Sequence, residues 1–198
     1  PAQLDLQGAA AVRGGELLLT PPLPPEAMGS AWIHMRSEHP PLTHFNVSLE
    51  ALMGGTGGAQ GLSLCYGPPT AAAFGDGGCH AASLMVRLLH GPEHRVELSF
   101  NGTVLASASV YPVLRAASFV PLEWIVDAAA GVSLQVHSRL LLSSVPLPTS
   151  WLTAPRANWR IGLGARTGPA SANHRIRSLR IRSSLLDPRP PRSRSSFK

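Results

Sequence analysis

The sequence predicts an all-β fold, a sandwich or barrel of short strands, from three observations. Alternation of apolar and polar residues with a period of two is its dominant pattern. The 198 residues include 19 glycines and 19 prolines, which cluster between the alternating runs as turn residues do. No segment shows a clear helical stripe, and charged residues make up only 14% of the chain. Many short strands without intervening helices are typical of sandwiches and barrels.

The clearest strand lies at residues 45–51, where odd positions are apolar and even positions polar. This pattern predicts one face on a core and one in water. Residues 95–100 and 104–108 alternate in the same way around Asn101-Gly102, a strong hairpin signal because both residues tolerate the positive φ of a type I′ turn. Residues 140–142 are ambiguous. Further strands are predicted at 17–20, 32–36, 62–66, 84–89, 120–126, 132–138, 159–165 and 175–182.

The length fits one large β domain, which we predict over residues 1–186. Residues 187–198 are rich in Pro, Arg and Ser and predict a basic linker or tail. No run of about 18 uninterrupted apolar residues occurs, so we expect no direct membrane insertion. The chain starts at Pro1 without a signal-peptide pattern, which we interpret as the start of a segment from a longer precursor.

Two kinds of feature predict a secreted domain or one on the extracellular side of a membrane. Asn46-Val47-Ser48 and Asn101-Gly102-Thr103 are N-glycosylation sequons, and the hairpin tip at Asn101 is the more accessible of the two. Cys65 falls in a predicted strand and Cys79 ends a glycine-rich loop, so we expect them to form a disulfide. Two buried free thiols are the alternative.

The net charge of +6 comes from an excess of arginine near the C-terminus. Arg175, Arg177, Arg180 and Arg182 alternate with apolar residues along one predicted strand, with a register break near Ser178 that indicates a bulge. Arginines on an edge strand protect a sheet from aggregation, which is one interpretation. The other is binding of an acidic polysaccharide or an acidic protein. Because the charge is confined to one strand and a tail, we expect no nucleic-acid partner.

Several motifs follow one another at suggestive spacings. They are Gly29-Ser30-Ala31-Trp32, residues 45–50 (FNVSLE), 59–64 (AQGLSL), 74–78 (FGDGG), 119–122 (FVPL), Leu147-Pro148 before Trp151, 159–168 (WRIGLGARTG) and 173–176 (NHRI). Over about residues 4–184 their order resembles the concanavalin A-like lectin/glucanase superfamily, the sandwich of L-type lectins and laminin-G-like modules. The resemblance implies a two-sheet antiparallel β-sandwich, a concanavalin A-like jelly roll.

The resemblance also implies where a sugar would bind. A Gly-rich loop helps to line the sugar site of L-type lectins, so Asp76, Gly77 and Gly78 are the implied carbohydrate-binding residues. Trp151 is expected in a loop as an exposed stacking platform, and the other three tryptophans in the core. Sugar-binding L-type lectins carry Asp where this chain has Gln60, and they hold calcium and manganese with clustered acidic residues. Here the acids are scattered, so we expect no bound metal and no cofactor.

We expect no catalysis. Glycosidases need two carboxyl groups flanking the scissile bond, whereas Glu50, Glu97 and Glu123 stand singly on predicted strands. His90 and His94 flank a predicted turn and have no further zinc ligand. We therefore predict a noncatalytic recognition domain that binds glycans or other protein domains within a larger adhesion or receptor-like protein. A purely structural packing module is the alternative, and a glycosidase the third candidate.

Overall fold

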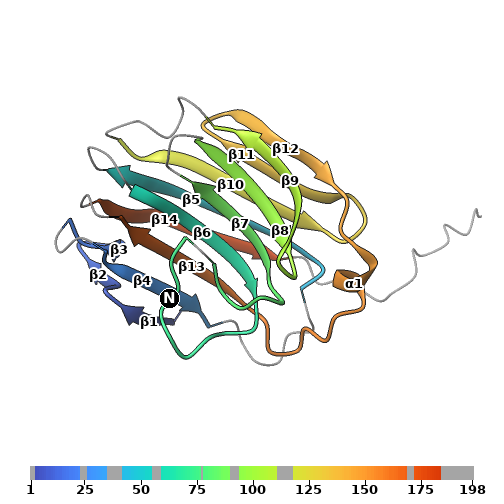
Figure 1. Cartoon of the computed structure of the whole chain (residues 1–198), viewed down its shortest axis with the longest axis horizontal. Coiled ribbons are helices and arrows are strands. Elements are labelled where there is room, and N and C mark those ends of the chain that lie inside the picture. The colour runs from blue at the N-terminus through green and yellow to red at the C-terminus, as the bar shows by residue number, and fades with distance from the viewer. Residues whose placement is uncertain are drawn as a thin grey trace, which may run out of the picture.

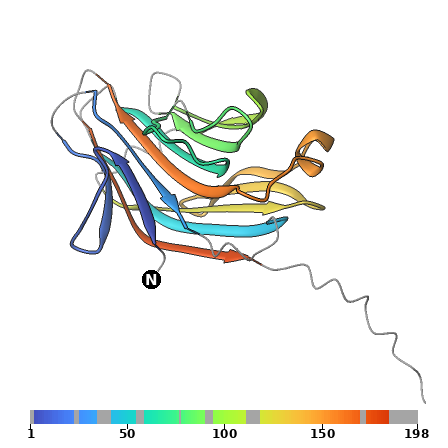
Figure 2. The same cartoon turned by 90° about the horizontal axis from the view of Figure 1, so that it is seen from below.

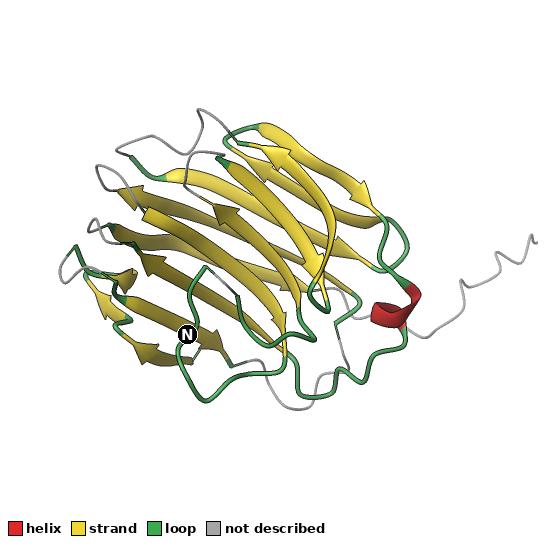
Figure 3. Ribbon diagram, viewed as in Figure 1, coloured by secondary structure: helices red, strands yellow, loops and turns green. Residues whose placement is uncertain are grey.

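The computed structural model describes residues 3–22, 26–34, 42–54, 59–76, 78–89, 94–110, 118–168 and 172–183. Almost all of the regular structure is strand (Figure 3). The elements in chain order are β1 (Leu4–Gly8), β2 (Ala11–Arg13), β3 (Glu16–Thr20), β4 (Met28–Ile33), β5 (His44–Gly54), β6 (Ala59–Gly67), β7 (Leu84–Leu89), β8 (Arg95–Phe100), β9 (Thr103–Ser109), β10 (Val120–Asp127), β11 (Gly131–Val136), β12 (Arg139–Val145), α1 (Thr149–Leu152), β13 (Arg160–Thr167) and β14 (Asn173–Ser183). The predicted tail, residues 187–198, lies outside the described residues.

The strands form two seven-stranded sheets packed as two layers (Figures 1 and 2). Sheet A has the order β1-β4-β13-β6-β7-β8-β9, and sheet B has the order β12-β11-β10-β5-β14-β3-β2. All pairings are antiparallel. The last two strands insert into the interior of the sheets, β13 between β4 and β6 and β14 between β5 and β3. The predicted two-sheet antiparallel sandwich is therefore confirmed.

The core lies between the layers and follows the predicted alternation. Phe45 and Val47 of β5 are fully buried, and the residues that alternate with the buried ones along this strand face outward. Phe45 makes edge contacts with Tyr66 and Trp124 at centroid distances of 5.0 and 5.2 Å, and Trp159 contacts Tyr66 at 5.2 Å. Such aromatic pairs add to the free energy gained from burial.

Two predicted local features are confirmed. Asn101 and Gly102 have φ values of 50° and 75°, as expected for the tight turn that joins β8 to β9. In β14 the register against β5 shifts between Arg177 and Arg180, and Ser178 has a φ of 55°. This is the bulge that the break in alternation indicated.

Other boundaries differ from the predictions. The strand expected at residues 32–36 runs instead from Met28 to Ile33. It includes Gly29, where a Cβ would lie 2.0 Å from the Leu19 carbonyl oxygen, so the close approach of β3 explains why a weak strand former stands there. The ambiguous residues 140–142 belong to β12, and β1, β2 and the short helix α1 were not predicted. No helix in the described ranges is long and apolar enough to cross a bilayer.

Candidate ligand-binding faces

The outer surface of sheet A, here called face A, carries a long loop between β6 and β7, residues 68–83. Figure 1 shows the loop extending over this part of the sheet. Phe74 of the loop packs on Trp32 at a centroid distance of 5.0 Å, and both are buried. Glycines make room for it: a Cβ on Gly164 would lie 2.4 Å from the Phe74 ring, and one on Gly162 would lie 3.0 Å from it. The small residues of β13 thus allow the loop to lie flat on the sheet.

Three further contacts anchor this β6–β7 loop. Cys65 and Cys79 form a disulfide, which confirms the predicted pairing. The Ser63 hydroxyl donates to the Gly75 carbonyl at 2.8 Å. The Arg87 Nε donates to the Asp76 carbonyl at 2.7 Å. Backbone segments on both sides of the loop tip are therefore held to the sheet.

Two of the three implied sugar-binding residues are described, and both lie at the tip of this loop. Asp76 is partly exposed, and within the described residues its carboxylate makes no ion pair. The Gly78 amide donates to the Gly75 carbonyl at 3.1 Å, and Gly78 has a φ of 92°, which disfavours a side chain. Gly77 lies outside the described residues.

Beside the loop tip, face A carries an ion cluster that the sequence did not reveal. Glu97 of β8 is buried and faces Arg87 across the β7–β8 pair. Its carboxylate oxygens lie 3.3 Å from a terminal guanidinium nitrogen of Arg87 and 2.8 Å from one of Arg95. Alternation along β8 already places Arg95 and Glu97 on one face, but only the β7–β8 register brings Arg87 to them.

The donor set at this loop does not fit a calcium ion. Calcium takes six to eight oxygen ligands, usually including several carboxylates. The neighbouring carboxylate, Glu97, is already bound by the guanidinium groups of Arg87 and Arg95. The Asp76 carbonyl already accepts a hydrogen bond from the Arg87 Nε. No group of three or more His, Cys, Asp or Glu side chains in the described ranges is arranged to hold a metal.

Trp151 is not the exposed platform that was expected, and this prediction is wrong. Its side chain is fully buried in the core. Residues after Pro148 form the short helix α1 rather than an open loop, and the turn directs the indole inward. The guanidinium carbon of Arg156 lies 4.0 Å from the centre of the indole. Arg156 is itself buried, and desolvation lowers its pKa below the usual value for arginine.

The outer surface of sheet B, here called face B, carries the arginines of β14. The bulge at Ser178 restores the alternation, so Arg175, Arg177, Arg180 and Arg182 all pair with positions of β5 whose side chains face outward. The edge-strand interpretation is only half right. β14 is interior where β3 pairs with residues 174–176, but beyond them β5 alone among the described strands pairs with it.

The four arginines fall into two pairs with different surroundings. Arg175 forms an ion pair with Glu16. Arg177 donates from Nε to Glu50 at 2.5 Å, and its guanidinium stacks on Phe119 at 4.1 Å from the ring centre. Arg180 and Arg182 are exposed and make no ion pair within the part of the chain that the structure describes. Half of the predicted polyanion strip is therefore already neutralised.

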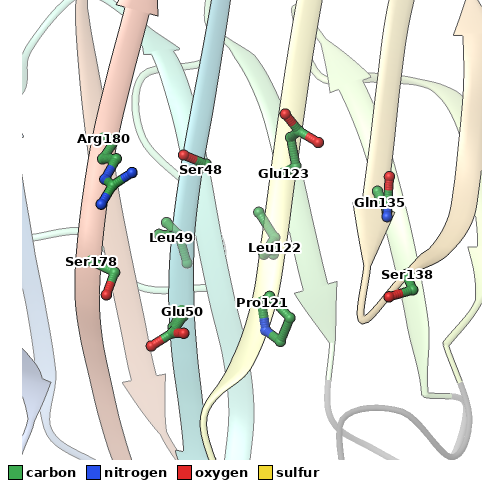
Figure 4. Close-up of a pocket in the computed structure, with 10 residues that line it drawn as sticks. All are labelled: Ser48, Leu49, Glu50, Pro121, Leu122, Glu123, Gln135, Ser138, Ser178 and Arg180. Carbon is green, nitrogen blue, oxygen red and sulfur yellow. The ribbon is translucent and has the colours of Figure 1, made fainter.

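A hollow of about 450 Å³ opens on face B next to Arg180. Figure 4 shows side chains from β14, β5, β10 and β11 around it. The buried leucines Leu49 and Leu122 contribute to its floor from below. The outward side chains that line it are Ser48, Glu50, Pro121, Glu123, Gln135, Ser138, Ser178 and Arg180.

The two sequons have different environments. Asn101 is exposed at the β8–β9 turn. Asn46 lies in the interior strand β5, is partly buried, and donates from its side-chain nitrogen to Glu123 at 2.6 Å. A glycan would be linked through that same nitrogen, so the geometry favours Asn101 as the acceptor.

No protein-family model and no curated protein matches the chain. Solved structures do. The exoplasmic/lumenal domain of VIP36 in its Ca²⁺/Man2-bound form has a TM-score of 0.72 at 19% identity, over 94% of this chain and 83% of that one. The potassium-bound carbohydrate recognition domain of Emp46p gives 0.69 at 16% identity, over 93% and 90%. The metal-free lectin I-B4 of Griffonia simplicifolia gives 0.72 at 18% identity, over 92% and 93%. The chain therefore has the concanavalin A-like sandwich fold of L-type lectin domains.

Proposed function

We propose that this chain is a noncatalytic recognition domain that binds a glycan on face A, at the tip of the β6–β7 loop. The observation that carries the proposal is the anchoring of this loop by a disulfide, an aromatic contact and two hydrogen bonds from the sheet. Recognition loops bind best when a rigid scaffold holds them in place, because little ordering entropy is then lost on binding. The lectin neighbours of the fold support a sugar as the ligand.

The groups at the loop tip suit hydroxyl-rich ligands. The Asp76 carboxylate accepts hydrogen bonds from sugar hydroxyls, and the backbone at Gly78, two residues further along the loop, is partly exposed. The two positive charges of Arg87 and Arg95 are balanced by the carboxylates of Glu97 and Asp76, so these four side chains carry no net charge. A neutral sugar is therefore favoured on face A.

We infer that this binding needs no calcium. The disulfide and Arg87 hold the loop in place. The described side chains around it are not arranged to hold a metal ion. We place the domain, residues 1–186, in an oxidising compartment as part of a larger secreted or membrane-anchored protein, since a structural disulfide persists there. The similar domain of VIP36 is its exoplasmic/lumenal domain, which supports this setting. Asn101 would then carry a glycan.

The test is a glycan array probed with the wild-type chain and with Asp76→Asn, in calcium and in EDTA. We expect wild type to bind a neutral glycan equally in both buffers, and Asp76→Asn to bind it about tenfold more weakly, the loss of one charge-assisted hydrogen bond. Asp127→Asn, on the other sheet, is the matched control and keeps full binding. Absence of binding by the wild type to every glycan would contradict the proposal and favour a structural packing module.

A further inference from the structure

The hollow on face B has opposite charges on its two sides. Arg180 of β14 stands on one side, exposed and without an ion pair in the described residues. Glu123 of β10 stands on the other, accepting one hydrogen bond from the Asn46 amide at 2.6 Å. Glu50, lower on β5 in Figure 4, is neutralised by Arg177 at 2.5 Å. The charges open to a ligand are therefore one guanidinium and one carboxylate.

The shape of the hollow is set by short side chains. Ser48 stands between Arg180 and Glu123, and Ser178 and Pro121 lie below them in Figure 4. Small side chains beside long ones leave a depression whose volume, about 450 Å³, is in the range of small-molecule sites. Pro121 adds an apolar surface, and Gln135 supplies both a donor and an acceptor on the β11 side.

Placement of Arg180 depends on the bulge. Side chains of a regular strand alternate, so a strand that placed Arg175 and Arg177 outward would direct the residue at 180 inward. The extra residue at Ser178 reverses the alternation and directs Arg180 to face B opposite Ser48. Bulges often redirect a side chain at a functional site. Here the bulge costs an unfavourable positive φ at a non-glycine residue, which a purely protective edge would not need.

These groups match one class of ligand. A carboxylate binds a guanidinium through two parallel hydrogen bonds, and hydroxyl groups donate to a carboxylate such as Glu123. We propose that the hollow binds a sugar unit of the uronic-acid type, with its carboxylate on Arg180 and its hydroxyls on Glu123 and Gln135. A densely sulfated chain fits less well, because Glu123 repels further negative charge. The site is separate from face A and does not depend on the function proposed there.

The test uses a trimer of galacturonic acid and its fully methyl-esterified form, which differs by one methyl group on each carboxyl and carries no charge. Binding is followed by calorimetry with the wild type, Arg180→Gln and Arg13→Gln, an exposed arginine of β2 on the same sheet. We expect the wild type and Arg13→Gln to prefer the acid over the ester by about tenfold, and Arg180→Gln to lose that preference. Equal melting temperatures of the three proteins establish that folding is unchanged.

Four results overturn the inference. They are no binding of the acid by the wild type, equal binding of acid and ester, an acid preference that survives in Arg180→Gln, and tighter binding of heparin than of the trimer. Tighter binding of heparin would instead favour a strip of arginines that binds polyanions through charge alone. The Asp76→Asn variant separates the two proposals, because loss of its binding to neutral glycans should leave binding of the galacturonate trimer unchanged.

Discussion

The two outer faces of this sandwich are built by the same strand alternation, yet one is covered and the other open. Face A places Trp32, Cys65 and two glycines of β13 outward, and a loop covers them and is bonded to them. Face B places serines and charged side chains outward, and its hollow is open to solvent. Outward apolar and small residues require a cover, because exposed aromatic surface is costly. A face of polar and charged side chains needs no cover, because water solvates it.

We expect the largest effect from removing the disulfide that holds the β6–β7 loop to face A. In the double variant Cys65→Ser, Cys79→Ser we expect the free energy of unfolding to fall by about 3 kcal/mol, because the unfolded chain loses a cross-link between residues 14 apart. Urea denaturation measures this loss. Limited proteolysis should then cut the β6–β7 loop first. Arg180→Gln on face B is the control and should change stability by less than about 0.5 kcal/mol. Equal losses in both proteins would contradict the comparison.

A smaller change should test whether the glycines of β13 are the reason that the loop lies flat. In Gly164→Ala the new Cβ would lie 2.4 Å from the Phe74 ring and 2.7 Å from its carbonyl oxygen. We expect a loss of about 1–3 kcal/mol, the usual result of overpacking. Gly54→Ala is matched to it, since its Cβ would meet nothing closer than 3.8 Å. If thermal unfolding of the two variants is the same, the close packing of the loop is not essential.

Lowering the pH should reduce the stability of the fold only slightly, through a carboxyl group on sheet B. The pKa of Asp127 is lowered mainly by hydrogen bonds from the Ala130 and Ala129 amides and then by one from His44. A carboxyl whose folded-state pKa is depressed stabilises the fold above its unfolded pKa of about 4, and that stability is lost as the pH falls through the lower folded value. Wild type should therefore exceed Asp127→Asn in stability at pH 7, by less than about 1 kcal/mol for this partly exposed group.

The measurement compares urea denaturation of wild type and Asp127→Asn from about pH 7 down to about pH 2.5. Subtracting the two curves removes the titration of all other groups that the proteins share. The difference should begin to shrink near pH 5, about one unit above the unfolded pKa, and should fall further as the pH drops through the lower folded-state pKa. A difference that is constant across this range would show that the hydrogen bonds to Asp127 do not stabilise the fold.

Local pattern was enough to predict much of this molecule. Alternation placed most strands within two or three residues, Asn101-Gly102 predicted the β8–β9 turn, and the break near Ser178 predicted the bulge. Cysteine count and position led to the disulfide. Each of these signals is carried by residues close together in the chain. The order of the motifs then indicated the fold, because spacing between strands reflects the connections of a particular sandwich.

Tertiary structure alone decided which of the predicted groups are available to a ligand. Trp151 looked exposed but is buried, because a single helical turn directs it into the core. Arg175 is neutralised by Glu16, a residue 159 positions away, while Arg180 is left unpaired within the described chain. The closing of face A likewise depends on glycines of β13 lying under Phe74 of the β6–β7 loop. Pairings over such separations come from sheet order and register, and no local periodicity encodes them.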